Sequence, residues 1–183
     1  TLPGEATLAE QMEVVDPEVL HQARTGLARY LASGLEGEFI RLYDAFAPLG
    51  PYRPVTAEAG RRRLRNLCLA YLNELDSAAH RALARQQFDG ADNMTDQFAA
   101  LSVLANAPGD EQAEGESALA AFYGRWQHEA LVVDKWLAVQ ASSRQPGTLA
   151  RVDSLTSHPA FDRKNPNKIY ALLRTFGANH RHF

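Results

Sequence analysis

The segment TAEAGRRRLRNLCLAYLNEL, residues 56–75, carries the clearest structural pattern in the chain. Its apolar residues recur at steps of three and four, which is the spacing that places side chains on one face of an α-helix. Arginines occupy other positions along the segment, so the expected helix is amphipathic, with one face directed into a core. The apolar positions are Leu64, Leu67, Cys68, Tyr71, Leu72 and Leu75.

The same periodicity continues on both sides of this segment and predicts about nine short amphipathic helices. Asp16-Pro17 and Asn165-Pro166 each combine an N-cap residue with proline at the first helical position, so a helix is expected to begin at each site. We expect Gly34 and Gly37 to break the first of these helices and Gly177 to end the second.

Weaker patterns place the remaining elements. Asp76 or Ser77 is expected to cap the helix that follows residue 75, residues 89–93 to form a turn, and residues 107–115 to form a polar loop. Leu149, Val152 and Leu155 predict a short helix. In the last helix the apolar residues expected to face inward are Ile169, Leu172, Leu173 and Phe176.

These patterns predict an all-α fold of antiparallel helix pairs stacked side by side. A curved, solenoid-like array of the HEAT or armadillo type is favoured over a closed bundle, because no heptad register persists along the chain. With 183 residues, 45% of them hydrophobic, one domain over residues 1–183 is predicted. Since the first residue is Thr1 and not Met, we expect this domain to be a piece of a longer polypeptide.

Composition restricts the possible functions. The formal net charge of −3 argues against a nucleic-acid-binding protein, which needs a positive field. No apolar run has the length of a membrane span, so no membrane association is predicted. Cys68 is the only cysteine and cannot form an internal disulfide; its place in an apolar stripe predicts an inert, buried thiol.

A run of arginines needs separate consideration. Arg61, Arg62 and Arg63, together with Arg65, could contact phosphate groups. In an acidic chain, however, such a run is more often a solvated helix face paired with nearby carboxylates, such as that of Glu58. We therefore expect no nucleic-acid interface here.

No metal site and no catalytic residue is predicted. The nearest match to a zinc-peptidase motif is His128-Glu129-Ala130-Leu131-Val132, which has valine where a second histidine is required. His180 and His182, with His158 and Asp162, form another possible cluster. Histidines at a chain end are usually solvated, and no further ligand is spaced to complete a tetrahedral site.

Two tryptophans, Trp126 and Trp136, lie on apolar stripes. We expect them to pack between helices, with Val132 and Val133 beside the second. Each indole N–H then needs an acceptor.

Three short strings are more informative than any of these single residues. They are Ala91-Asp92-Asn93-Met94-Thr95-Asp96, Leu131-Val132-Val133-Asp134-Lys135-Trp136, and His158-Pro159-Ala160-Phe161 followed by Asn165-Pro166-Asn167-Lys168. In this order and spacing the chain resembles the carboxy-terminal helical domain of bacterial aminopeptidase N, a family of zinc-dependent alanyl aminopeptidases of the gluzincin class. The resemblance covers nearly the whole chain.

The resemblance implies a role without chemistry of its own. In that family the helical domain follows a thermolysin-like domain that holds zinc and the catalytic glutamate, closes over the active site, and walls a cavity that admits peptides. The implied function is therefore that of a non-catalytic cap in a cytoplasmic aminopeptidase, with the catalytic domain of the same polypeptide as its partner. The implied substrates of the parent enzyme are peptides, and the implied cofactor, zinc, lies outside this chain.

Candidate cavity-lining residues follow from the same resemblance and are Asn165, Asn167, Lys168 and Tyr170. The family often has arginine where this chain has Tyr170, so a basic contact at this position is in doubt, although tyrosine can still form a hydrogen bond.

Two further expectations concern an alternative function and the carboxy-terminal end of the helical array. The main alternative function is a free-standing helical scaffold that binds a protein or peptide partner in a concave groove. The family domain continues beyond the position of Phe183, so the helical array is expected to be truncated at its carboxy-terminal end. Self-association through the apolar stripe of the last helix, including Leu173, is then expected.

Overall fold

The computed structural model describes residues 2–107 and 112–183, and all regular secondary structure in these ranges is helical. This confirms the predicted all-α class. Residues 108–111, which fall in the expected polar loop, lie outside the described part of the chain. Within the described ranges, no helix is both long and apolar enough to cross a membrane.

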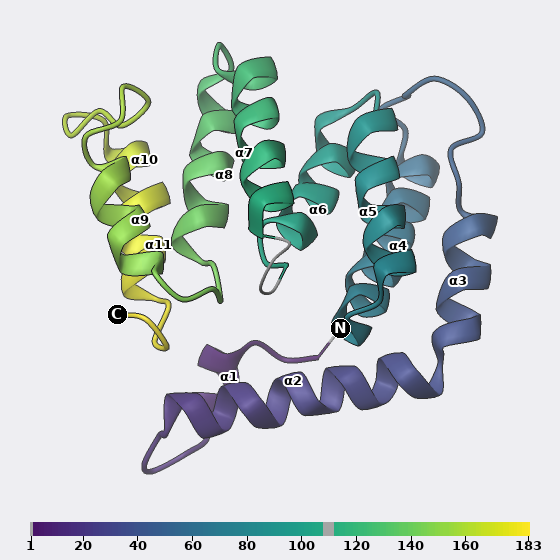
Figure 1. Ribbon diagram of the computed structural model, residues 1–183, viewed down its shortest axis with the longest axis horizontal. Helices are drawn as coiled ribbons and strands as arrows, with labels where there is room; N and C mark the ends of the chain where they lie inside the picture. Colours follow the sequence, from purple (N-terminus) through teal and green to yellow (C-terminus); the bar gives the residue numbers. More distant parts are fainter. Residues whose placement is uncertain (1, 108–111) are drawn as a thin grey trace. The chain divides into compact units, whose positions relative to one another are not determined.

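The chain divides into two compact units, Thr1–Val103 and Leu104–Phe183. A single domain over residues 1–183 stays a prediction, because each unit is defined by itself. The helices of the first unit are α1 (Glu5–Ala9), α2 (Pro17–Gly34), α3 (Glu36–Ala45), α4 (Thr56–Leu72), the 3-10 turn η1 (Asn73–Leu75), α5 (Ala78–Gly90) and α6 (Met94–Leu104), which ends at the unit boundary (Figure 1). Those of the second unit are α7 (Gln112–Trp126), α8 (Ala130–Ala141), α9 (Thr148–Leu155), α10 (Pro166–Ile169), the π-helical turn η3 (Tyr170–Arg174) and α11 (Thr175–Gly177).

Both predicted N-caps are confirmed. Asp16 Oδ1 accepts hydrogen bonds from the backbone N–H groups of Glu18 and Val19, at 3.0 and 3.1 Å, and α2 begins at Pro17. Asn165 Oδ1 accepts from the N–H of Asn167 at 3.0 Å, and α10 begins at Pro166. In each case the side chain satisfies a donor that the first helical turn leaves unpaired.

Some expected boundaries were wrong. Gly37 lies inside α3, because α2 already ends at Gly34 and only Leu35 separates the two helices. Gly115 is part of α7 and not of a loop. A Cβ atom at this position would lie 2.6 Å from the carbonyl oxygen of Leu104, so only glycine permits α7 to approach the backbone of Leu104 this closely within the second unit.

The N-terminal helix α1 was not anticipated, because five residues are too few to show a periodic pattern. It is held by polar contacts to α2. Glu5 Oε1 lies 2.9 Å from Nδ1 of the buried His21, and Arg24 donates a hydrogen bond to the carbonyl of Pro3.

The core of the first unit is the apolar face of α4. Cys68, Leu69 and Leu72 are completely buried, and Tyr71 stacks on Phe39 of α3 with ring centroids 5.0 Å apart. The inert, buried thiol expected at Cys68 agrees with this position, and burial raises the pKa of the thiol.

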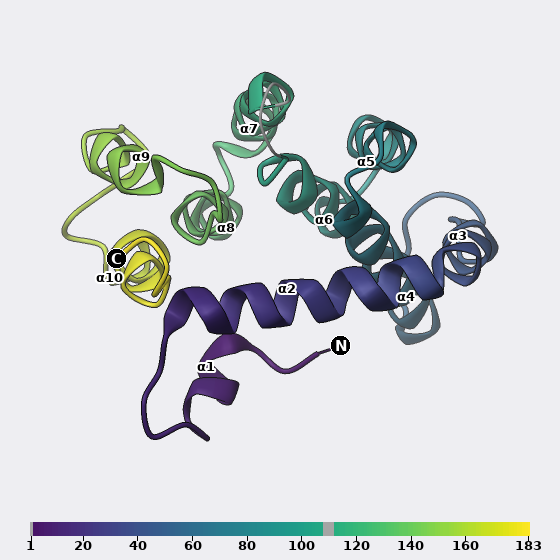
Figure 2. The same ribbon diagram turned by 60° about the horizontal axis from the view of Figure 1, so that its bottom comes forward.

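In the second unit α7 and α8 lie side by side in both views (Figures 1 and 2), and the last helix packs on α8. Phe122 of α7, Leu137 of α8 and Leu172 of the last helix are completely buried. Leu149 of α9 is exposed, contrary to its predicted place in an apolar stripe, whereas Val152 and Leu155 are buried as expected.

Candidate functional site

The four candidate cavity-lining residues lie at the start of the last helix but do not share one environment. Asn165 caps α10, and Asn167 is exposed. Tyr170 is 55% exposed, with the guanidinium of Arg174 5.6 Å from its ring centroid. A cavity-lining role for these residues stays a prediction.

Lys168 is the exception, because only 7% of it is exposed. Its Nζ atom lies 2.7 Å from Asp134 Oδ1 and donates a hydrogen bond to the carbonyl of Ala130 at 2.9 Å. Both partners belong to α8, and a buried ammonium is tolerated only when it is paired in this way. Lys168 therefore fixes the last helix to α8.

The second and third strings also meet around Trp136. The indole Nε1–H donates to the carbonyl of Leu119 at 3.0 Å, which confirms the predicted core position and its need for an acceptor. The rings of Tyr123 and His158 lie 4.7 and 5.1 Å from the Trp136 ring, centroid to centroid. His158 Nδ1 accepts from the N–H of Ala160, so the imidazole is held within an aromatic cluster.

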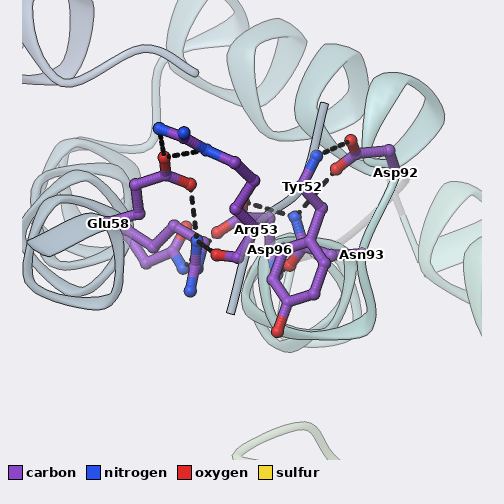
Figure 3. A network of polar contacts seen from close by, with 8 residues as sticks. Tyr52, Arg53, Glu58, Asp92, Asn93 and Asp96 are labelled. Atoms are coloured by element: carbon purple, nitrogen blue, oxygen red, sulfur yellow. Dashed lines mark hydrogen bonds and ion pairs between the residues drawn. The ribbon is translucent and has the colours of Figure 1, made fainter. Parts of the chain in front are cut away.

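The first string forms a buried polar network in the other unit, part of which is drawn in Figure 3. Asp96 is 3% exposed, and its two carboxylate oxygens accept hydrogen bonds from the side-chain amides of Asn66 and Asn93, at 2.8 and 2.9 Å. Asn93 Oδ1 in turn accepts from the N–H of Asp96, which caps the start of α6. The Asn93 amide is thus committed to structure.

The network extends from Asp96 to α5 and α3. Gln87 donates to Asn66 Oδ1 at 2.7 Å and to the carbonyl of Asp96 at 3.0 Å. Its Oε1 atom accepts from the hydroxyl of Tyr43 at 3.1 Å, and the Arg65 guanidinium lies 4.1 Å from the centroid of the Tyr43 ring. Burial raises the pKa of Tyr43, and Arg65 opposes that shift. Side chains from α3, α4, α5 and α6 are thereby joined.

The arginine run is not a simple solvated face, which corrects the expectation. Arg61 lies over the ring of Phe46 at 5.0 Å and donates to the carbonyl of Ala45, and Arg62 lies over the ring of Tyr52 at 4.8 Å. The predicted pairing with Glu58 is confirmed for Arg62, at 3.8 Å. These contacts fasten the α3–α4 connection to α4.

Two acidic side chains complete this attachment (Figure 3). Glu58 also pairs with Arg53, and Asp92 Oδ2 accepts from the N–H of Tyr52 at 2.7 Å. The cavity beneath the connection measures only about 40 Å³, enough for a water molecule and too small for a substrate.

The larger hollow, about 400 Å³, lies in the second unit between α7, α8 and α9. Its charged lining residues Arg151 and Glu116 form an ion pair, and Arg151 also donates to Gln140. Because the pair neutralises itself, the hollow presents no net charge to a ligand.

The residues that the structure describes do not form a zinc site. No group of three or more histidine, cysteine, aspartate or glutamate residues within 2–107 and 112–183 is arranged to hold a metal. His128 and Glu129 are both exposed, and Val132 offers no ligand atom one turn later. We therefore derive no reaction step through zinc at these residues.

Comparison with known proteins identifies the family. Residues 1–183 match the family described as a domain of unknown function (DUF3458_C) with ARM repeats. The chain belongs to this family. The description agrees with the predicted armadillo-like class of helix pairs.

Curated relatives are aminopeptidases. The chain is 36% identical to aminopeptidase N of Haemophilus influenzae over 180 residues, 39% identical to that of Caulobacter vibrioides over 175, and 34% identical to that of Escherichia coli over 180. These matches cover 96–98% of this chain but 20% of each relative, so the chain spans about a fifth of their length.

A solved structure gives the same result. The crystal structure of Legionella pneumophila aminopeptidase A in complex with aspartic acid superposes with a TM-score of 0.83 at 32% identity. It covers 96% of this chain and 21% of that one. The resemblance to an aminopeptidase helical domain, first indicated by the three strings, is thus confirmed.

Proposed function

We propose that this chain is a non-catalytic helical cap of a zinc aminopeptidase that removes amino-terminal residues from peptides. In this proposal the chain walls the active-site cavity and packs on the catalytic domain of the same polypeptide. Zinc and the catalytic glutamate lie outside residues 1–183. A cytoplasmic location belongs to the same proposal.

The observation that carries the proposal is the extent of the match. Nearly the whole chain aligns with a fifth of each aminopeptidase N relative. Hydrolysis by a metallopeptidase needs a metal-activated water and a general base. His128-Glu129 matches the first half of the zinc-binding motif H-E-x-x-H, but Val132 stands where the second histidine is required. This favours a structural role over a catalytic one.

Metal analysis and an activity assay test this proposal. The purified chain, dialysed without chelator, should contain no stoichiometric zinc and should not release p-nitroaniline from alanine p-nitroanilide. His128→Ala is the control and should change neither result. One zinc per chain that disappears in His128→Ala would overturn the proposal.

The native reading frame provides the second test. The proposal expects an in-frame H-E-x-x-H motif, a more distant glutamate, and aminopeptidase activity in the full-length product. A complete reading frame without that motif would instead favour a free-standing helical scaffold.

A further inference from the structure

The longest helix of the first unit, α2, has an apolar face that the described part of the chain leaves exposed. Its buried side is formed by His21, Ala28 and Ala32. On the opposite side, apolar residues and glycines recur at steps of three and four and contain no charged residue. These residues, here called the α2 face, are Val19, Ala23, Gly26, Leu27, Tyr30 and Gly34.

The α2 face is large and strongly exposed. Val19, Leu27 and Tyr30 are 59%, 47% and 77% exposed. From residue 19 to residue 34 the helix rises roughly 22 Å. Just before the helix, Met12 and Val14 are also exposed. Contiguous apolar surface of this kind marks an interaction site.

Gly26 leaves the middle of the α2 face without a side chain. It lies in the interior of an 18-residue helix, where glycine is less stable than alanine. A Cβ atom there would meet nothing within 4 Å, so no packing within the described chain requires glycine. Gly115, by contrast, is required by the carbonyl of Leu104. Gly60 in α4 is equally open, so Gly26 permits the close approach of an external segment but does not by itself require one.

We infer that the α2 face is the surface on which the remainder of the aminopeptidase polypeptide docks. This inference rests on the proposed function. The relatives are about five times as long as the region matched here, so most of their polypeptide lies outside it. An uncharged, apolar face is typical of a permanent interface and not of a transient one. A partner within the same polypeptide meets that requirement.

Thiol labelling tests the inference, using Tyr30→Cys in the isolated chain and in the full-length product of the native reading frame. Cys68 is buried and should react slowly. We expect the maleimide labelling rate at position 30 to fall at least tenfold in the full-length protein. Leu49→Cys, 85% exposed on the α3–α4 connection, is the control and should label within twofold of the same rate in both.

Equal labelling of position 30 in the two proteins would overturn the inference. Protection that appears in the isolated chain and grows with its concentration would assign the α2 face to a second copy, and would also overturn it. Aminopeptidase activity of the same full-length sample reports separately on the proposed function, so failure of one is distinguished from failure of the other.

The melting temperatures of two glycine variants provide a second test. Gly26→Ala and Gly60→Ala both replace an exposed helical glycine with open space around it, so both should raise the Tm of the isolated chain. In the full-length protein Gly60→Ala should still raise the Tm, whereas Gly26→Ala should lower it. A rise for both variants in both proteins would show that nothing approaches Gly26, and the inference would fail.

Discussion

The two units of this protein use different means to hold their helices together. In the first unit, amides, a carboxylate and arginines stacked on aromatic rings join four helices around Asp96 through many individually modest contacts. In the second unit, Trp136 with its ring neighbours and the Lys168–Asp134 pair concentrate the contacts at two places. The first unit therefore spreads its contacts over many side chains, whereas the second depends more on single residues.

Spectroscopy can separate the two units. Both tryptophans of the chain, Trp126 and Trp136, belong to the second unit, so tryptophan fluorescence reports on that unit alone. Far-UV circular dichroism reports on helices in both. Urea titrations followed by both signals therefore give the comparison directly.

The largest effect is expected for Trp136→Ala. The substitution removes a buried ring and leaves the carbonyl of Leu119 without its donor, so we expect a loss of about 3–5 kcal/mol in the free energy of unfolding. Leu131→Ala, on the same helix but 72% exposed, is the control and should change it by less than about 0.5 kcal/mol. Similar midpoints for the two variants in fluorescence-detected urea titrations would contradict a concentrated core.

Lys168→Met should have the next largest effect. The charge of Asp134, whose side chain is 19% exposed, would lose its ammonium partner, at an expected cost of about 3 kcal/mol. The double variant Lys168→Met/Asp134→Leu removes both charges and should regain most of that loss in the same titration. If the double variant is no more stable than the single one, packing and not charge pairing holds the last helix.

Asp96→Asn should lower the free energy of unfolding by less, about 2 kcal/mol. The carboxylate of Asp96 accepts hydrogen bonds from two side-chain amides, and in the variant one of these donors would face the NH2 group of the new amide. The control is Asp89→Asn, which breaks only the exposed ion pair with Arg85 and should cost under about 1 kcal/mol. Circular dichroism gives both values. A loss at Asp96 greater than that at Trp136 would reverse the comparison between the units.

The smallest effect concerns alkaline pH. Burial raises the pKa of Cys68 above its ordinary value of 9.0 and that of Tyr43 above 10.0. The folded protein therefore holds these protons more tightly than the unfolded chain. Their contribution is complete below pH 9 and is lost as the pH rises through the folded-state values. We expect the free energy of unfolding to decline from about pH 9, with Cys68→Ala showing a shallower decline between pH 9 and 10. An unchanged slope would assign the decline to other groups.

The fold class, both proline-initiated helices and the core position of Trp136 could be predicted from sequence because each depends on local pattern. For Leu173 the sequence predicted a place in the inward stripe of the last helix, on the part of it left bare for self-association; Leu173 is 42% exposed, while Leu172 and Phe176 are buried. All three residues lie in or just after a π-helical turn, Tyr170–Arg174, which the local sequence pattern does not indicate.

Polar residues were the other limit of sequence analysis. Gln87 and Lys168 are ordinarily exposed types, and nothing in their local sequence indicates burial. Their partners, Asn66 and Asp134, are 21 and 34 residues away, so only the tertiary structure brings them together. Two of these four residues, Asp134 and Lys168, lie in the strings that carry the family resemblance, and their role there is structural.

The glycines of this chain also differ in how strongly the fold restricts their substitution during evolution. At Gly115 a mutation to any other residue pushes a Cβ atom into the Leu104 carbonyl, and at Gly147 the backbone has φ +83°, which side chains disfavour. Substitutions at these two positions should therefore be rare among related sequences, because they would disturb the fold. At Gly26 the fold imposes no such restriction. Whether glycine is kept there among related sequences should therefore depend on what contacts the α2 face.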